Sequence, residues 1–278
     1  EAVRNTVGKT TGAAVLELVK AANLRGRGGA GFPTGMKWSF VPPVDGKGHR
    51  YLVANADEME PGAFKDRLIL KRDPHQLIEG MILAAYAISA DIGYIFVRAE
   101  YHLATSRLRQ AVADARNRGL LGANIAGSEF SFELSVHQSA GRYICGEETA
   151  LLNSLEGKRA IPRAKPPFPQ VSGLFGRPTI VNNVETLCNV VHIVANGPDW
   201  FKGLGLLQDA GTKLFGVSGR VKRPGCWELP MGTTIREIIE DHAGGMCDGY
   251  ALRGFLPGGG STDFLVPEHL DLPMEYDT

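Results

Sequence analysis

The chain has 278 residues, 44% of them hydrophobic and 22% charged, a globular composition long enough for one large or two smaller domains. Thirty basic and thirty acidic residues give a formal net charge of zero, so no overall field draws the chain to nucleic acid or to a membrane surface. No apolar run approaches the ~18 residues of a membrane span, and no signal peptide is visible. We therefore expect no nucleic-acid partner and no direct membrane insertion.

The first elements in chain order are a helix and a glycine-rich loop. Residues 13–22 have helical spacing and few β-branched residues, which indicates a helix that ends near Asn23. The next segment, 25–38, carries five glycines between residues 26 and 35, too many for the interior of a helix or strand. Unhindered N–H groups in such a loop form a concavity that binds an anion. We predict a phosphate-binding loop in this segment, with a flexible glycine linker as the alternative.

The pattern Gly26-x-Gly28-x-x-Gly31 also matches the dinucleotide-binding fingerprint. That fingerprint requires a strand before the glycines, whereas the segment before this loop indicates a helix. Arg25 and Lys37 flank the glycines and add positive charge. The sequence therefore predicts a phosphate loop that is not an ordinary Rossmann turn.

An acidic loop follows the first predicted strand. Residues 51–54 indicate a short buried strand, which leads into a loop at 55–62 that contains Asp57, Glu58 and Glu60. In open α/β sheets, ligands bind beyond the carboxyl ends of the strands. These carboxylates can accept hydrogen bonds from ribose hydroxyls, and they would repel a 2′-phosphate, which favours NAD over NADP. A solvated turn and a divalent-metal site are the alternatives.

The following elements alternate between helix and strand, which predicts an α/β sheet. They are helices at 64–72, 74–90 and 100–118, strands at 92–98 and 130–137, and a loop at 139–149 before a helix at 150–156. Glu147 and Glu148 lie where the dipole of that last helix favours carboxylates. Such a placement is either purely structural or part of a site.

A basic, proline-rich segment comes next. Residues 157–184 contain five basic residues and no acidic one. Lys165 and Phe168 offer an ammonium group and an aromatic face, which suit the phosphate and adenine of a nucleotide; an exposed proline-rich connector is the alternative. The motif Asn182-x-x-Glu185 then predicts a capping box, and the helix it opens provides a second anion-binding end.

After Gly197 the pattern changes to a small α+β module. We predict strands at 213–219 and 226–229, a helix at 235–242, and a domain boundary near residue 205. The first residue is Glu rather than Met, and the last residues show no closing helix, so we expect a fragment of a longer chain.

The four cysteines do not predict a metal site. They are Cys145, Cys188, Cys226 and Cys247, and none of them forms a C-x-x-C pair. Neither a zinc site nor an iron–sulfur framework is visible. We expect reduced thiols in a cytoplasmic protein.

Six motifs, taken together and in order, resemble the flavin-binding subunits of bacterial respiratory complex I. The motifs are Arg25-Gly-Arg-Gly-Gly-Ala-Gly-Phe32, Gly35-Met-Lys-Trp38, Asn55-Ala-Asp-Glu-Met-Glu-Pro-Gly62 with Lys65-Asp-Arg67, Gly141-Arg-Tyr-Ile-Cys-Gly-Glu-Glu-Thr-Ala-Leu151, Pro162-Arg-Ala-Lys-Pro-Pro-Phe-Pro169 and Asn182-Asn-Val-Glu-Thr186. The resemblance covers almost the whole chain. It implies a Rossmann-like α/β domain for FMN and NADH at 1–205 and a small α+β β-grasp (SLBB-like) domain at 206–278. It also implies that the family's following helical domain, with its [4Fe–4S] cluster, is missing from this sequence.

The resemblance assigns the FMN contacts to three parts of the chain. The glycine loop and Lys37 would hold the phosphate, together with the start of the helix after residue 181. Acidic and amide side chains after the first strand, with Glu147, would meet the polar groups of the flavin. The residues implied around FMN are Gly26, Arg27, Gly28, Gly29, Gly31, Lys37, Asn55, Asp57, Glu58, Gly146, Glu147, Asn182, Asn183 and Thr186.

The NADH contacts implied by the resemblance come from aromatic, acidic and basic side chains. They are Phe32 and Phe40 as brackets, Phe168 on the adenine, Glu60 on the adenosine ribose, Lys165 along the phosphates, and Tyr143 and Glu148 in the nicotinamide pocket. The last two are the candidate catalytic residues.

The activity implied is that of an FMN-dependent NADH dehydrogenase, an NADH:quinone oxidoreductase. FMN accepts a two-electron hydride and releases single electrons to iron–sulfur clusters, so the protein needs only to stack the nicotinamide on the flavin and exclude water. The acidic residues are expected to bind and tune rather than to act as a nucleophile or base.

The implied partners are a thioredoxin-like [2Fe–2S] subunit and a large iron–sulfur subunit. They would place the chain on the cytoplasmic side of the inner membrane, in the hydrophilic arm of the complex. One alternative is a diaphorase subunit of an NAD-reducing hydrogenase or of an NAD-dependent formate dehydrogenase. Another is a nucleotide-binding structural subunit without turnover.

Overall fold

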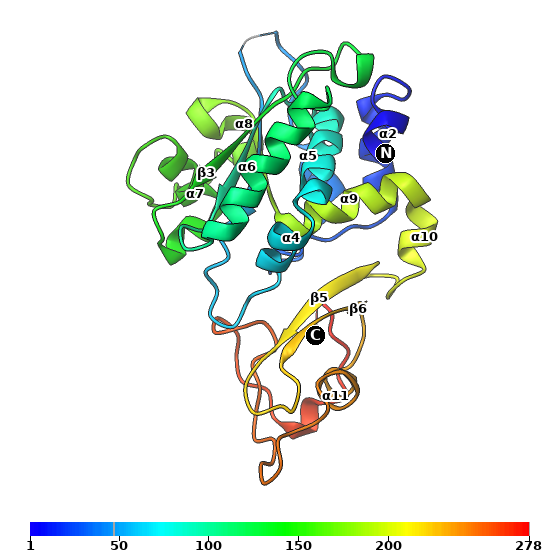
Figure 1. The fold of residues 1–278 in the computed structure, drawn as a ribbon, viewed down its shortest axis with the longest axis vertical. Helices are drawn as coiled ribbons and strands as arrows, with labels where there is room; N and C mark the ends of the chain where they lie inside the picture. Colours follow the sequence, from blue (N-terminus) through cyan, green and yellow to red (C-terminus); the bar gives the residue numbers. More distant parts are fainter. Residues whose placement is uncertain (47, 278) are drawn as a thin grey trace.

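The structure is a computed structural model that describes residues 1–46 and 48–277. Figure 1 shows a larger α/β part that contains the N-terminus and a smaller part below it, around β5 (Thr212–Val217) and β6 (Gly225–Pro230). The larger part holds a four-stranded sheet and the smaller part a two-stranded sheet. The predicted fold class is thereby confirmed. The boundary that we propose near residue 205 falls in the connection between α10 (Pro198–Lys202) and β5 (Thr212–Val217).

Four parallel strands form the central sheet in the order β3-β2-β1-β4. They are β1 (Tyr51–Ala56), β2 (Ile92–Val97), β3 (Glu133–Gln138) and β4 (Thr179–Asn183). In the middle of β1, Val53 lies opposite Tyr94 of β2 and Val181 of β4. The chain adds β2 and β3 on one side of β1 and β4 on the other, so the strand order reverses beside β1. In open α/β sheets, ligands bind in the crevice at such a reversal.

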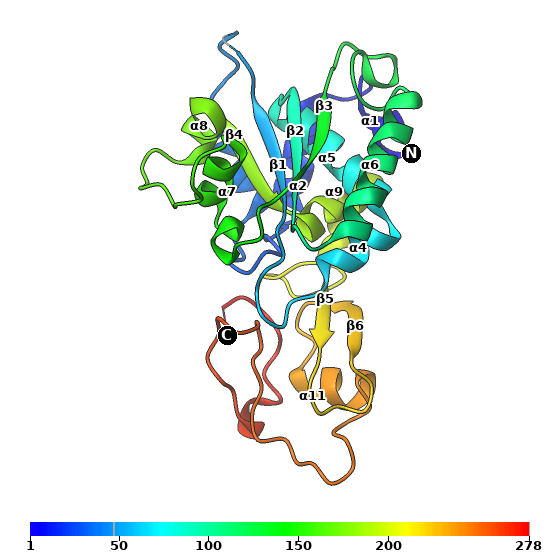
Figure 2. The same cartoon turned by 60° about the vertical axis from the view of Figure 1, so that its left-hand side comes forward.

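Helices cover both faces of this sheet, as is usual for parallel strands. Figure 2 shows α2, α4, α5, α6 and α9 on one side of the sheet and α7 and α8 on the other. Their bounds are α2 (Gly12–Ala21), α4 (Asp66–Arg72), α5 (Pro74–Ile88), α6 (His102–Asn117), α7 (Glu148–Leu155), α8 (Pro169–Ser172) and α9 (Val184–Asn196). Along β1, Leu52 and Ala54 join the larger core cluster while Tyr51 and Val53 join the smaller one, because successive side chains point to opposite faces.

The long helix α5 shows how local sequence and packing agree. The side chain of Asp73 accepts a hydrogen bond from Gln76 N, and Pro74 occupies the first turn. Later in α5, a Cβ at Gly80 would lie 2.1 Å from the carbonyl oxygen of Leu187 in α9. The missing side chain therefore lets α5 and α9 pack closely.

Several short elements were not predicted from the sequence. Among them are the helices α1 (Ala2–Thr6), α3 (Thr34–Ser39) directly after the glycine loop, α8 and α10, and the strand β4. β4 has only five residues and continues into α9 without an intervening turn, so neither its length nor a turn signal distinguishes it. Pairing with β1 is what makes this segment a strand.

The predicted capping box Asn182-x-x-Glu185 is wrong. Asn182 belongs to β4, and Asn183 caps α9 with a side chain that accepts from Thr186 N. Glu185 does not turn back to the cap. Its carboxylate is buried and binds Lys65 Nζ and Leu214 N, which come from other parts of the chain.

The C-terminal module is built on an antiparallel pair, β5 and β6 (Gly225–Pro230). The predicted helix at 235–242 begins as α11 (Ile235–Glu237) and continues as a π-helical turn (Ile238–His242). Thr234 and Glu237 form a complete capping box at its start.

Charged groups attach this module beneath the glycine loop. The Arg25 guanidinium lies 2.8 Å from carboxylate oxygens of both Asp209 and Asp277, and it stacks 4.8 Å from the ring centroid of Tyr276.

No helix within the described ranges is long and apolar enough to cross a membrane.

Candidate functional site

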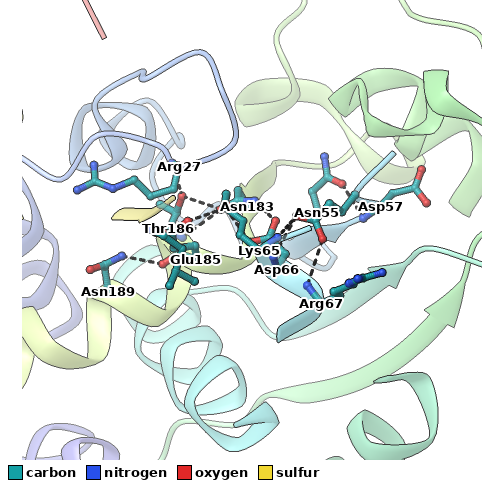
Figure 3. Close-up of polar contacts among 12 residues, drawn as sticks. Arg27, Asn55, Asp57, Lys65, Asp66, Arg67, Asn183, Glu185, Thr186 and Asn189 are labelled. Atoms are coloured by element: carbon teal, nitrogen blue, oxygen red, sulfur yellow. Dashed lines mark hydrogen bonds and ion pairs between the residues drawn. The ribbon is translucent and has the colours of Figure 1, made fainter. Parts of the chain in front are cut away.

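A pocket lies at the strand reversal, between the carboxyl ends of β1 and β4. The glycine loop and the start of α9 complete it (Figure 3). Its lining residues are Gly26, Gly28, Ala30, Gly31, Phe32, Lys37, Asn55, Glu148, Val181, Asn182, Asn183 and Thr186. Ten of these were candidate site residues from the sequence; Ala30 and Val181 were not. The fold therefore brings together segments that are more than 150 residues apart in the chain.

The glycine loop is closed on itself and held against α9. Gly26 N donates to the carbonyl of Phe32 at 3.0 Å, which closes the base of the loop. Arg27 N donates to Thr186 Oγ1 at 2.8 Å. Gly31 has φ +62°, and a Cβ there would lie 2.5 Å from the Tyr276 ring. Glycine is required at Gly31 both by its backbone conformation and by this close contact.

The side chain of Arg27 does not face the pocket. It is 1% exposed, and its guanidinium donates to the carbonyl oxygens of Arg25, Ala210 and Thr212. These contacts hold the glycine loop against the C-terminal module, and cofactor binding by Arg27 stays a prediction. Its local sequence, an arginine among glycines, gives no signal of this inward orientation.

Lys37 reaches the pocket from α3. Its Nζ donates to Glu148 Oε2 at 2.8 Å and to the carbonyl of Val181 at 2.9 Å. Lys165 Nζ lies 2.6 Å from Glu148 Oε1. Burial alone would raise the pKa of Glu148, but the two lysines lower it overall. The site thus contains an ionised carboxylate between two cations.

Asp57 lies just beyond β1 and is 5% exposed. Ser139 Oγ donates to Asp57 Oδ1 at 2.8 Å, whereas Oδ2 has no hydrogen-bond partner among the described residues. Burial raises the pKa of Asp57 from 3.8 to about 6, although the Ser139 hydroxyl opposes the shift. An unpartnered buried carboxylate oxygen is costly, which makes Oδ2 a candidate acceptor for a ligand donor.

We expect Asp57→Asn to stabilise the ligand-free chain at pH 8 by about 1–2 kcal/mol. The folded chain keeps a proton on Asp57 between pH 3.8 and about 6 that the unfolded chain releases. Stability contributed by this group therefore falls as the pH rises through that window. Urea unfolding at pH 8 and at pH 4 tests this, since the gain should vanish at pH 4, and equal gains at both pH values would contradict it.

Asn55 and Glu147 are each partly committed to local contacts. Asn55 Nδ2 donates to the carbonyl of Gly146 at 2.8 Å, which ties β1 to the loop before α7. Glu147 is the N-cap of α7, and its Oε2 accepts from Thr149 N and Ala150 N. Its Oε1 lies 3.7 Å from Lys165 Nζ. One carboxylate oxygen of Glu147 is thus structural and the other faces a cation.

Glu58, a candidate ligand from the sequence, is occupied by the protein. It is 8% exposed, and its carboxylate accepts from the amides of Lys65, Asp66 and Arg67 and from the Tyr101 hydroxyl. Four donors leave no free acceptor toward the pocket. In this structure Glu58 caps the start of α4, and its contact with the cofactor stays a prediction.

A buried ionic cluster lies beside the pocket residue Asn183 (Figure 3). Lys65 Nζ lies 2.8 Å from Asp66 Oδ1 and 2.6 Å from Glu185 Oε2. Asn183 Nδ2 donates to Asp66 Oδ2 at 2.6 Å, while Leu214 N donates to Glu185 Oε1 at 2.7 Å. The cluster therefore links α4, α9 and β5, and it fixes the pocket residue Asn183.

Three aromatic candidates are exposed near the pocket mouth. Phe32, Phe40 and Phe168 are 47%, 52% and 53% exposed. The rings of Phe32 and Phe40 lie 6.4 Å apart at an interplanar angle of 51°, and Lys165 Nζ lies 6.0 Å from the Phe168 ring centroid. The neighbouring rings of Phe32 and Phe40 form an exposed apolar surface of the kind that ligand-binding grooves present.

Glu60 and Tyr143 meet outside the pocket lining. The Tyr143 hydroxyl donates to Glu60 Oε2 at 2.7 Å, and both contact Ser261 of the C-terminal module.

Gly29 is a further candidate residue that does not line the pocket. Ser139, Trp38, Val181 and Ser261 contact candidate site residues and were missed, because each acts through a contact that only the tertiary fold creates.

Among the described residues, no group of three or more histidine, cysteine, aspartate or glutamate side chains has the arrangement of a metal site. The divalent-metal alternative for the acidic loop therefore finds no support there.

Two family models match the chain. The Nuo51 FMN-binding domain matches residues 19–192, and the SLBB domain matches residues 214–264. The F subunits of the NADH-quinone oxidoreductases of Salmonella typhimurium and Escherichia coli are each 60% identical over 264 residues, which is 95% of this chain and 59% of each relative. A further F subunit, numbered 2, from Rhizobium meliloti is 54% identical over 277 residues, which is 100% of this chain and 66% of that relative. The chain thus spans less than two thirds of the length of the first relatives.

A solved structure is also similar. A chain of an NAD⁺-reducing [NiFe]-hydrogenase, solved in the H₂-reduced state, matches with a TM-score of 0.87 and 42% identity. The match covers 95% of this chain and 44% of the hydrogenase chain.

Proposed function

This chain belongs to the family of the Nuo51 FMN-binding domain, and from that premise we propose that it binds FMN and passes to it the hydride of NADH. The proposal makes the chain the NADH-dehydrogenase part of an NADH:quinone oxidoreductase. The F subunits of NADH-quinone oxidoreductases support it at 54% to 60% identity. The observation that carries it is the pocket at the strand reversal, lined by the glycine loop, Lys37 and the amide side chains of β1 and β4.

One feature of the pocket and one of its surroundings fit FMN. Gly28 forms part of the pocket wall, and a Cβ there would lie 3.1 Å from Asn183 Cβ, so glycine keeps this part of the wall free of a side chain. Buried Asp57 Oδ2 has no partner in the described chain and can accept a hydrogen bond from a polar flavin group. A phosphate suits the glycine loop and Lys37, and an uncharged polar ring suits the region of Asp57 and Asn55.

When bound, FMN supplies the chemistry that converts a hydride into single electrons. The residues of this chain bind and orient. Lys37 is fixed by Glu148 and the Val181 carbonyl, so its ammonium is preorganised for an anion. Tyr143 and Glu148 are the groups that we propose for the nicotinamide side. Because the reaction transfers a hydride, no side chain has to act as nucleophile or essential base.

We propose that NADH lies over the exposed aromatic rings and the acidic loop. Phe32 and Phe40 would cover the dinucleotide, Phe168 the adenine, and Lys165 the phosphates, where it would also offset the charge of Glu148. Glu60 would accept hydrogen bonds from the adenosine ribose. A carboxylate at that position disfavours the extra phosphate of NADPH.

Glu60→Gln should therefore relax the discrimination against NADPH by roughly tenfold, because it removes a negative charge near the ribose 2′ position. The measurement is kcat/KM for NADH and for NADPH with ferricyanide as acceptor. Glu133→Gln, an exposed carboxylate at the start of β3 that pairs with Arg116, is the control and should leave the ratio unchanged. An unchanged ratio in Glu60→Gln would remove Glu60 from the ribose site.

The experiment that tests the proposed function is an anaerobic titration of the FMN-reconstituted chain with NADH, followed by flavin absorbance. Bleaching by NADH and poor bleaching by NADPH is the expected result. A folded chain that binds no FMN would overturn the proposal.

A second kind of complex, an NAD⁺-reducing hydrogenase, is compatible with the same chemistry, because the similar solved structure carries that name. The higher identity of the relatives from NADH-quinone oxidoreductases favours the quinone-linked complex. We propose as partners the thioredoxin-like [2Fe–2S] subunit and the large iron–sulfur subunit, on the cytoplasmic side of the inner membrane. Co-purification of the full-length protein from its own cells distinguishes these subunits from those of a hydrogenase.

A further inference from the structure

A loop of the C-terminal module forms hydrogen bonds with the acidic loop of the α/β domain. We call residues 258–262 the clasp loop. Ser261 N donates to Glu60 Oε1 at 2.6 Å, and Ser261 Oγ donates to Glu60 Oε2 at 2.5 Å. Gly260 N donates to the carbonyl of Pro61 at 2.9 Å. The module therefore holds both oxygens of one carboxylate that lies 201 residues earlier in the chain.

The close approach depends on glycine. Gly259 has φ +97°, and a Cβ there would lie 2.9 Å from Glu60 Cγ and 2.9 Å from the carbonyl oxygen of Pro61. A side chain would thus meet both the backbone and the carboxylate stem of the acidic loop. Inside the clasp loop, Thr262 Oγ1 donates to the Gly259 carbonyl at 2.9 Å. This hydrogen bond supports the conformation in which the loop contacts Glu60.

The hydrogen bonds to Glu60 hold its carboxylate in place without placing a positive charge beside it. All its donors, from Ser261 and from the Tyr143 hydroxyl, are uncharged. No lysine or arginine within residues 1–46 and 48–277 forms an ion pair with Glu60. Burial alone would raise the pKa of Glu60, but the hydrogen bonds from Ser261 and Tyr143 lower it overall. The carboxylate stays ionised and in one orientation.

We propose that the clasp loop is part of the nucleotide site and that Ser261 is a positioning residue, which orients Glu60 for the adenosine ribose and so enforces the preference for NADH over NADPH. The inference rests on the proposed function, because it uses the ribose role of Glu60. Holding a flexible glutamate in its binding rotamer removes an entropic cost that the nucleotide would otherwise meet on binding. The C-terminal module thereby contributes to recognition although it lines no part of the FMN pocket.

The test uses two variants of the FMN-loaded chain, Ser261→Ala and Gly259→Ala. The first removes the hydroxyl donor, and the second drives the clasp loop from Glu60. Gly249→Ala is the matched control, because Gly249 has φ +82° in the same module but nothing within 4 Å of an added Cβ. It carries the same backbone strain without touching the acidic loop.

Binding of ADP-ribose and of its 2′-phosphate is measured by calorimetry, so that no turnover is needed. We expect ADP-ribose to bind roughly five- to tenfold more weakly to both variants, while FMN affinity is unchanged. The affinity for the 2′-phosphate of ADP-ribose should fall less, so that the ratio of the two affinities becomes smaller. As the pH is lowered, Ser261→Ala should lose ADP-ribose binding at a higher pH than the unmodified chain does. The reason is that Glu60 then lacks the hydrogen bond from the Ser261 hydroxyl, which lowers its pKa.

Unchanged or tighter ADP-ribose binding in both variants, with FMN retained, would overturn the inference while leaving the proposed function intact. Weakening in Gly249→Ala equal to that in Gly259→Ala would also overturn it, since strain alone would then explain the effect. If the unmodified chain binds FMN but neither ADP-ribose nor NAD⁺, the proposed function fails first.

Discussion

Lys65→Met is expected to destabilise the folded chain by about 3–5 kcal/mol, because it leaves a buried ionic cluster without its cation. The side chains of Lys65, Asp66 and Glu185 are only 13%, 5% and 5% exposed. Removing the lysine leaves two buried carboxylates side by side with neither charge compensated. Urea unfolding followed by circular dichroism measures the loss.

The pH dependence of that loss separates charge from packing. Burial, the largest influence on Asp66, raises its pKa to about 6 even with Lys65 present. Without Lys65, at least one carboxylate takes up a proton on folding, so the variant should recover stability as the pH falls from 8 towards 5. Lys9→Met, at an exposed lysine near the N-terminus, should have little effect. A pH-independent loss in Lys65→Met would mean that packing of the lysine stem, not its charge, matters.

The second large effect is expected from Gly28→Val, which should weaken FMN binding at least roughly a hundredfold. An added Cβ would lie 3.1 Å from Asn183 Cβ, and Gly28 and Asn183 both line the pocket, so we expect the two methyl groups of valine to narrow it. Gly28→Ala, with a single methyl, should lose less, so the series glycine, alanine, valine grades the space available. Fluorescence quenching of FMN gives the affinities.

The stability of the ligand-free variants serves as the control for this series. Gly28 lies in a surface loop, and the core clusters do not include it. The midpoints of urea unfolding should therefore change little while FMN affinity falls. Equal FMN affinity across the series would mean that FMN does not approach this loop, and the pocket assignment would be wrong.

Local sequence determined the helices and most strands of this protein. The apolar spacing of Leu77, Ile78 and Met81 indicates the helix predicted at 74–90, which the structure has as α5, with Pro74 in its first turn. The glycine density of residues 26–35 predicted an anion-binding loop before any fold was known, because backbone freedom and exposed N–H groups are local properties. Ten candidate residues then met in one pocket, although the individual contacts assigned to them remain proposals.

The tertiary structure alone decided which polar side chains remain available to a ligand. Glu58 and Asp57 are neighbours in the chain, yet Glu58 is saturated by four donors while one oxygen of Asp57 has no partner in the described chain. Likewise, the Arg27 side chain is buried and donates to the Ala210 carbonyl, and Ser261 donates to the Glu60 carboxylate. A carboxylate's local sequence does not encode how many donors will surround it. Those donors come from distant segments, and their number follows from the strand order, the packing of α9 and the position of the C-terminal module.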